Sequence, residues 1–396
     1  MDDSLIRDRQ DLFREDDSPL FREALSPESR QRVQRKMLTS SHFTEEEKNI
    51  FSEWLSSPAC AADLAGLIHG EKSLSEPNAR EIRFHGNPRT VYSLPWKEQA
   101  LLSLMNHALG LFDSCFSEHL YSHIRGRHPR NALSAIRNHR GFAQLYLFIT
   151  DIRHYGESID AGRLSTAIGA LPGMDPSLRT FLDRQIFTTP PAVKTGLPLT
   201  GFFENVYLRE LDEYMDRNAA FYARCVDDIL IGAESQQELD HLVSRLRVTT
   251  AEAKLLLHET KTRYVMPGES FSYLGWQICA GKVDFTPETL AQMRHVCRQS
   301  AIKLLRRYKA MQLVLPVRLM MTIRFANQLA AQFGIPEAFQ VVSVPDGLRE
   351  MDRMLCDMIR TAASGKIGKD KYRISYRDLR RWGYHSLVRR YYQSIR

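Results

Sequence analysis

The chain has 396 residues, 43% of them hydrophobic and 26% charged, which is ordinary for a soluble globular protein of two or three domains or subdomains. No apolar stretch is long enough to cross a membrane, the N-terminus lacks a signal-peptide pattern, and the six cysteines are scattered without a CxxC pair, so we expect a cytoplasmic protein without structural zinc. The net charge of +7 weakly favours a polyanionic partner, although such an excess is often only a solubility feature.

In chain order, the sequence predicts three zones without internal repeats. Residues 1–77 show helical patterns, and residues 78–278 alternate short β-prone runs with helical stretches. From Pro287 the chain is mostly helical, with breaks near Pro316 and Pro336. The middle zone therefore predicts an α+β layer, an antiparallel sheet covered by helices. Its expected strands are 144–150, 221–226, 229–232, 263–266 and 272–278, and its expected helices are 97–112 and 236–254.

Two adjacent carboxylates, Asp227 and Asp228, stand between two apolar runs, and Asp151 closes a third such run. Carboxylates in β-prone surroundings are costly unless a turn exposes them or a cation neutralises them. A hairpin that projects two carboxylates from its tip is a natural site for a divalent metal. An Asp-Asp pair at a solvated turn is common, and only Asp151 in similar surroundings favours the metal interpretation.

The C-terminal third is rich in basic residues with interleaved aromatic rings. Cations at helical spacing can neutralise backbone phosphates, and rings between them can stack on bases. Equally, the segment fits a pair of amphipathic helices with solvated cations and aromatic side chains in the core. The candidate nucleic-acid-binding residues are Arg294, Arg298, Arg306, Arg307, Arg380 and Arg381.

Motifs between residues 83 and 281 resemble, in order, the fingers and palm of prokaryotic reverse transcriptases, the family of the retron and group II intron enzymes. Residues 195–208 resemble the motif Gln-Gly-x-Pro-x-Ser…Asn-x-x-Leu, and residues 225–228, Cys-Val-Asp-Asp, are similar to the Tyr-x-Asp-Asp box. The remaining motifs are residues 86–95 (the fingers strand), 151–160 (the first palm motif), 258–262 (the lysine-bearing segment) and 271–276 (the strand that grips the primer).

The resemblance implies a right-hand polymerase fold. A helical N-terminal extension would cover residues 1–77, the fingers and palm residues 78–284, and a basic helical thumb with its tail residues 285–396. It also implies an in-line attack of a primer 3′-hydroxyl on a nucleotide, assisted by two Mg²⁺ ions about 3.5–4 Å apart. Asp227 and Asp228 can approach one metal site only if a tight turn joins them, because neighbouring residues on a strand point to opposite faces.

Each implied site residue has its own expected role. The metal set is Asp151, Asp227, Asp228 and Ile152, and Lys261 donates a proton to pyrophosphate unless it is only a solvated lysine at a strand end. Arg89 and, less directly, Lys97 hold the triphosphate. Gly196 and Asn205 shape the floor of the nucleotide pocket, or are ordinary turn and helix residues. Tyr155 and Gly156 lie where the family distinguishes the deoxyribose of a nucleotide from ribose. A structure that placed Asp151 far from residues 227–228 would rule this interpretation out.

Three positions depart from the family pattern. Cys225 replaces the usual tyrosine of the box, and Thr195 replaces the glutamine of the Gln-Gly motif. Five residues after Asp151, Gly156 stands where the family generally has a ring that blocks a ribose 2′-hydroxyl. Sugar discrimination is therefore either relaxed or moved to Tyr155.

We expect the partners to be a non-coding RNA template, dNTPs and a cDNA product, without a membrane. No pattern indicates an RNase H or a His-Asn-His endonuclease, and this lean architecture is similar to that of stand-alone bacterial enzymes of antiviral defence, most like the type 2 systems. Retron and domesticated intron enzymes remain alternatives. Two other functions stay open: a template-independent or protein-primed nucleotidyl transferase, and a non-catalytic, maturase-like RNA-binding scaffold.

Overall fold

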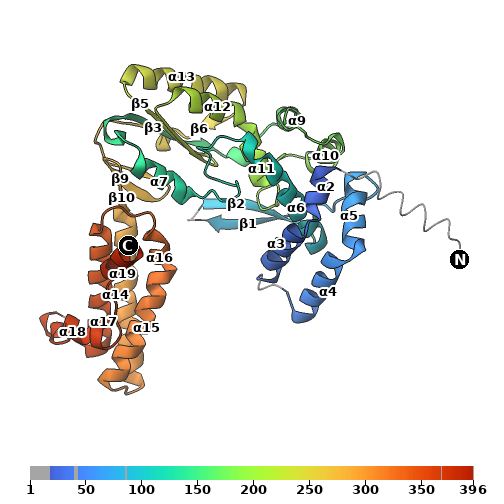
Figure 1. Cartoon of the computed structure of the whole chain (residues 1–396). Coiled ribbons are helices and arrows are strands. Elements are labelled where there is room, and N and C mark those ends of the chain that lie inside the picture. Colours follow the sequence, from blue (N-terminus) through green and yellow to red (C-terminus); the bar gives the residue numbers. More distant parts are fainter. Residues whose placement is uncertain (1–17, 40–42, 85–86, 367, 396) are drawn as a thin grey trace. The chain divides into compact units, whose positions relative to one another are not determined.

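The computed structural model of the chain describes residues 18–39, 43–84, 87–366 and 368–395 (Figure 1). These residues form two compact units. Unit 1 comprises the described residues of Met1–His128 together with Leu147–Tyr264, and unit 2 comprises Pro129–Tyr146 with the described residues of Val265–Arg396. Within the described ranges, no helix has both the length and the hydrophobicity needed to span a bilayer.

Unit 1 begins with helices whose start signals are readable in the sequence. Ser18 and Ser26 cap helices that begin with proline, and Thr44 forms a capping box with Glu47. α2 and α3 pack against α6, which follows the first hairpin. The helices are α2 (Pro19–Ala24), α3 (Pro27–Leu38), α4 (Glu45–Ser56), α5 (Pro58–Ile68) and α6 (Trp96–Leu109), the last extended by a 3₁₀ helix (Gly110–Cys115).

The first hairpin is formed by β1 (Asn78–Phe84) and β2 (Asn87–Ser93), which pair antiparallel. It carries Arg89 of the fingers-like motif, whereas Gly86 of that motif lies outside the described residues. The backbone N–H of Tyr92 donates to the Thr195 carbonyl at 2.8 Å, so β2 is tied to the motif at residues 195–208.

The main sheet of unit 1 has the strand order β4-β5-β3-β6, with β7 paired to β3. α12 packs on β4, and α13 packs on β5 and β6, so helices cover the sheet as the sequence predicts (Figure 1). The strands are β3 (Tyr146–Arg153), β4 (Phe221–Cys225), β5 (Asp228–Ala233), β6 (Leu256–Leu257) and β7 (Arg263–Val265). The helices are α8 (Tyr155–Ser158), α9 (Ala161–Gly169), α10 (Pro176–Phe181), α11 (Thr200–Tyr207), α12 (Arg209–Asn218) and α13 (Gln236–Glu252), with a π-helical turn at Leu182–Ile186.

One strand prediction is wrong. The run expected as a single strand, 272–278, is a hairpin of β8 (Phe271–Tyr273) and β9 (Trp276–Cys279), followed by β10 (Lys282–Phe285). The turn residues Leu274 and Gly275 have φ of +50° and +80°, the backbone of a two-residue hairpin turn. The hydrophobic run gave no sign of this turn, because a leucine rarely adopts positive φ and therefore does not predict a turn.

Unit 2 is mainly helical and has its own core. α17 (Asp346–Ser364) packs against α14 (Pro287–Ala310), α15 (Leu315–Gln332) and α19 (Leu387–Ser394). The expected breaks occur: Pro316 lies in the first turn of α15, and Gly334, at φ +64°, precedes a short helix. The other elements are α7 (Pro129–Asn138), α16 (Ile335–Ala338) and α18 (Tyr376–Arg381), with 3₁₀ helices at Phe142–Gln144 and Lys369–Arg373.

Candidate active site

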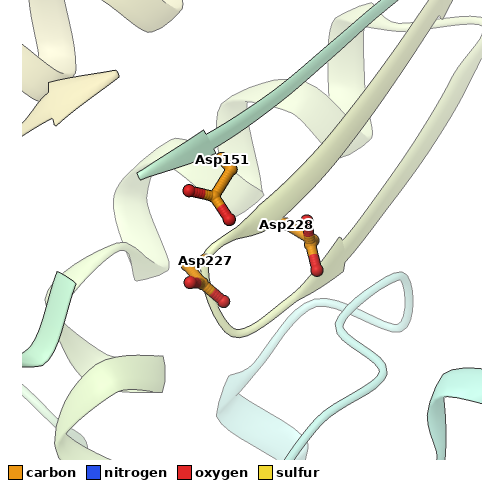
Figure 2. Close-up of side chains that lie close together, drawn as sticks. All are labelled: Asp151, Asp227 and Asp228. Atoms are coloured by element: carbon orange, nitrogen blue, oxygen red, sulfur yellow. The ribbon is translucent and has the colours of Figure 1, made fainter. Parts of the chain in front are cut away.

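Three carboxylates far apart in the sequence converge in unit 1. Asp151 lies near the end of β3, Asp227 in the turn between β4 and β5, and Asp228 at the start of β5 (Figure 2). One carboxylate oxygen from each lies within 4.8 Å of those from the other two. The geometry that the sequence interpretation requires is therefore present.

The turn that carries Asp227 is short and strained. Cys225 pairs directly with Asp228, so only Val226 and Asp227 form the loop, and Val226 has φ +59°. Positive φ is unfavourable for a β-branched residue and persists only where its surroundings hold it. Here the Ser122 hydroxyl accepts the Val226 N–H at 2.9 Å, and the Arg224 guanidinium donates to the Val226 carbonyl at 2.9 Å.

Asn205 supports this turn through Ser122. Its side-chain amide donates to the Ser122 carbonyl at 3.0 Å, and the residue is 1% exposed on α11. The structure thus places Asn205 as a buried link between α11 and the segment that holds Val226. Ser122 lies outside every motif, so no sequence signal marked it.

Gly196, the glycine of the Gln-Gly-like motif, allows a close approach to β2. Its φ is +103°, and an added Cβ would lie 2.6 Å from both the Tyr92 carbonyl oxygen and a Val91 methyl group. Only glycine fits both the conformation and the space. Gly196 therefore positions its motif against the first hairpin.

Lys261 and Ile152 both contact the carboxylate cluster. Lys261 Nζ lies 2.7 Å from Asp151 Oδ2, so the lysine is half-exposed but not simply solvated. The backbone N–H of Ile152 donates to the Asp227 carbonyl at 3.1 Å, which joins β3 to the turn. The Ile152 side chain is buried and apolar, so its main-chain carbonyl is the only group that it can offer a metal.

Burial and like charge raise the pKa of both carboxylates of the Asp-Asp pair. Burial, followed by the neighbouring Asp227 and Asp151, raises the pKa of Asp228 to about 7. Burial and Asp151 also raise the pKa of Asp227, although Lys261 and Arg89 oppose the rise. A divalent cation would relieve this repulsion, and carboxylate oxygens are the hard ligands that Mg²⁺ prefers. The donor set therefore fits a magnesium site.

Glu204 is a buried acid that sequence reasoning missed. Burial, with Asp227 nearby, raises its pKa to about 7, although Arg224 opposes the rise. A Cβ built on Gly156 would lie 3.2 Å from Glu204 Oε1, so a carboxylate borders the space beside this glycine. Tyr155 is 4% exposed, and its hydroxyl donates to the Glu204 carbonyl at 2.5 Å. The signal was available: Glu204 interrupts the apolar helix α11.

The two predicted triphosphate-binding cations are placed differently. Arg89 is exposed on β2, and its charge acts on Asp227, where it opposes the rise in pKa that burial and Asp151 cause. Lys97 instead lies 5.4 Å from the centroid of the Trp96 ring and 5.8 Å from that of Trp54. The structure therefore brings Arg89, and not Lys97, into the electrostatic environment of the carboxylates.

The predicted nucleic-acid-binding arginines of unit 2 are exposed. Arg294 forms an ion pair with Glu350, whereas the side chains of Arg298, Arg306 and Arg307 have no counter-ion among the described residues. The aromatic residues divide between the two expected roles. Tyr384 and Tyr391 are buried in the core, and Tyr372, Tyr376, Trp382 and Tyr392 are exposed. The exposed arginines lie on α14 (Arg294, Arg298, Arg306 and Arg307) and α18 (Arg380 and Arg381).

Comparison with known proteins gives a family match for the central segment. Residues 163–278 match the family model described as reverse transcriptase (RNA-dependent DNA polymerase). The matched segment includes Asp227, Asp228 and Lys261 and is therefore similar to reverse transcriptases, whereas Asp151 lies outside it. No curated protein matches the sequence significantly.

Similar solved structures include telomerases of two yeasts. Apo telomerase from Candida tropicalis aligns with 82% of this chain at 11% identity and a TM-score of 0.49, and its form truncated from the C-terminal domain aligns with 62% at 12% identity and a TM-score of 0.43. Telomerase from Candida albicans, in complex with a TWJ fragment of telomeric RNA, aligns with 84% at 11% identity and a TM-score of 0.45. The chain spans 62%, 63% and 70% of these three chains, respectively.

Proposed function

We propose that the protein is an RNA-directed DNA polymerase whose catalytic centre is formed by Asp151, Asp227 and Asp228. One observation carries this proposal: the three carboxylates converge, two of them within a segment that matches the reverse transcriptase family. An inactive scaffold would have no use for clustered, partly buried carboxylates, which are costly to retain.

The residues around the cluster suit nucleotidyl transfer. Asp151, Asp227 and Asp228, with the carbonyl of Ile152, would hold two Mg²⁺ ions. Magnesium bound there would stabilise the attacking and leaving oxygens of an in-line displacement. Ser122 accepts the Val226 N–H, and Arg224 donates to the Val226 carbonyl. These two bonds keep the turn, and with it Asp227, in place.

Two cations near the cluster have distinct proposed roles. Arg89 is exposed, and its charge reaches the carboxylates, so it is suited to binding the triphosphate of an incoming nucleotide. Lys261 orients Asp151 through their ion pair, and its half-exposed amine can donate a proton to the departing pyrophosphate.

The wider assignment follows the family resemblance. Residues 1–77 form an N-terminal extension, residues 78–284 fingers and palm, and residues 285–396 a thumb whose exposed arginines bind the template–primer duplex through its phosphates. We place the enzyme in the cytoplasm, where it copies a dedicated non-coding RNA into cDNA in antiphage defence.

Incorporation of labelled dNTPs with and without an added RNA template tests the activity. Template-dependent synthesis is expected; synthesis without template would indicate a terminal or protein-primed transferase, and no synthesis would favour an RNA-binding scaffold. Asp227→Ala should retain the RNA that co-purifies with the protein and lose the DNA. Glu213→Ala, in the middle of α12, is a control that should leave synthesis intact, because this partly exposed carboxylate pairs only with Arg209 and Arg217 among the described residues. DNA product from the Asp227→Ala protein would contradict the proposed centre.

A further inference from the structure

A cavity of about 550 Å³ lies in unit 1 outside the carboxylate cluster. Residues from α3, α6, the segment 123–128 and the start of α11 line it, and none of the three clustered aspartates does. Its volume falls within the range of small-ligand sites in proteins.

The lining of this cavity is strongly basic. Its acidic side chain, Asp113, accepts the backbone N–H of Arg125 at 3.0 Å and is thus already partnered. A wall of this kind favours an anion over a neutral or cationic ligand. The basic side chains of the lining are Arg32, Lys36, Arg125 and Arg127, joined by His107, His123 and His128.

Two of the arginines build the wall. The Arg125 guanidinium donates to the His107 carbonyl, and it pairs with Glu23 at 3.3 Å. Arg127 donates to the Ser117 carbonyl. These bonds hold the segment 123–128 against α2, α6 and the loop at Ser117, so both arginines already have structural partners.

Arg32 and Lys36 are different. Both are exposed on α3, and their spacing of four residues places them on the same face of the helix. Neither side chain forms an ion pair or hydrogen bond with the part of the chain that the structure describes. Within the described residues, the lining of this basic cavity therefore includes two exposed cations that have no such partner.

His107 is a second, independent sign of a ligand. Its side chain is 2% exposed, and neither ring nitrogen has a hydrogen-bond partner among the described residues. The Glu23 carboxylate lies 3.3 Å from Nε2 but without hydrogen-bond geometry. Buried polar groups without partners are rare and costly in native proteins. A ligand oxygen in the cavity would accept a hydrogen bond from the N–H of this ring.

We propose that the cavity binds phosphate groups of a single-stranded RNA, with Arg32 and Lys36 as the phosphate-binding cations. The cavity exceeds what a free phosphate ion fills, and paired cations at its mouth suit successive phosphates of a strand. One lining residue also lies near the buried acid of α11, since His123 Nε2 is 3.9 Å from Glu204 Oε2. That the strand is RNA rests on the proposed function, whereas phosphate recognition does not.

Fluorescence anisotropy with short single-stranded RNA, in EDTA and without nucleotides, tests this proposal. The double variant Arg32→Ala/Lys36→Ala should bind at least about tenfold more weakly, the factor that corresponds to one lost charge-assisted hydrogen bond. The slope of log affinity against log salt should fall in magnitude by about 1.4, as expected for two lost phosphate contacts. Both residues are exposed, so the variant should fold normally.

The control variant Arg35→Ala/Arg247→Ala removes the same charge from exposed positions of unit 1 outside the cavity. RNA should also protect Lys36 of the unaltered protein from acetylation. If the double variant loses the same affinity for 5′-phosphate and 5′-hydroxyl RNA, the cavity binds internal phosphodiesters. If it loses affinity only for the 5′-phosphorylated strand, the cavity binds a terminal phosphate. A loss no larger than that of the control, or acetylation of Lys36 unaffected by RNA, would overturn the proposal. The binding assay does not require catalysis, so it tests phosphate binding by the cavity independently of polymerase activity.

Discussion

The ion pair between Arg224 and Asp212 lies fully buried next to the turn that carries Asp227, with both side chains 0% exposed. Arg224 donates to the two Asp212 oxygens at 2.7 and 2.5 Å, and the Tyr222 hydroxyl donates to the same carboxylate at 2.7 Å. Asp212→Asn would leave the arginine without its counter-charge in a place that water does not reach. Breaking one partner of such a pair lowers the free energy of unfolding by about 3–5 kcal/mol.

The same substitution should lower polymerisation beyond its effect on stability. Arg224 also holds the Val226 carbonyl, and Val226 has the strained backbone that positions Asp227. Without its carboxylate partner, Arg224 would shift, and the turn would lose a support.

Urea unfolding and dNTP incorporation, measured at a temperature where the variant stays folded, would check both effects. The apolar double variant Asp212→Leu/Arg224→Met should lose clearly less stability than the sum of its single variants, because no charge is left buried. A destabilisation below about 1 kcal/mol for Asp212→Asn, or an additive double variant, would refute the reasoning.

Two further predictions concern pH and the sugar. The pKa of Asp228 is raised to about 7, so in EDTA the stability that its protonated form contributes is complete below pH 4 and is lost as pH rises through 7. Urea unfolding should give a lower free energy of unfolding at pH 8 than at pH 5 for the unaltered protein, and a smaller difference for Asp228→Asn. Equal differences in the two proteins would contradict this prediction. Tyr155 is buried and its hydroxyl bonds a backbone carbonyl, so we expect the unaltered protein to prefer dNTP over rNTP only weakly. An incorporation assay should give the same preference for Tyr155→Phe. A strong preference that this variant loses would assign sugar discrimination to Tyr155.

Residues that act through local chemistry were predictable from the sequence. Helix starts at Ser18, Ser26 and Thr44 follow from capping rules, and Phe221–Cys225 and Asp228–Ala233 follow from β-prone composition around an Asp-Asp pair. The two-residue turn between these strands was required by strand alternation, and the structure contains it. The carboxylates as a metal-binding set followed from residue type and motif order.

Residues that depend on their neighbours in space were not predictable. A hairpin replaced the strand expected at 272–278, because a turn at Leu274 leaves no local sign beyond one glycine. Lys97 lies over two tryptophan rings, whereas Lys261 bonds to Asp151, which is more than a hundred residues earlier in the sequence. Which cation lies near which carboxylate depends on the packing of segments and not on their composition.

The sequence by itself determined the chemical character of this protein, three carboxylates with hard oxygen ligands at the ends of β-prone runs, because ligand type and strand alternation are local properties. Only the tertiary structure decided that Asp151 lies beside residues 227–228, that Asn205 and Ser122 secure their turn, and that α3 presents its cations to a basic cavity. The physical reason is that these contacts join segments far apart in the chain, and burial and distance then set their charges and their roles.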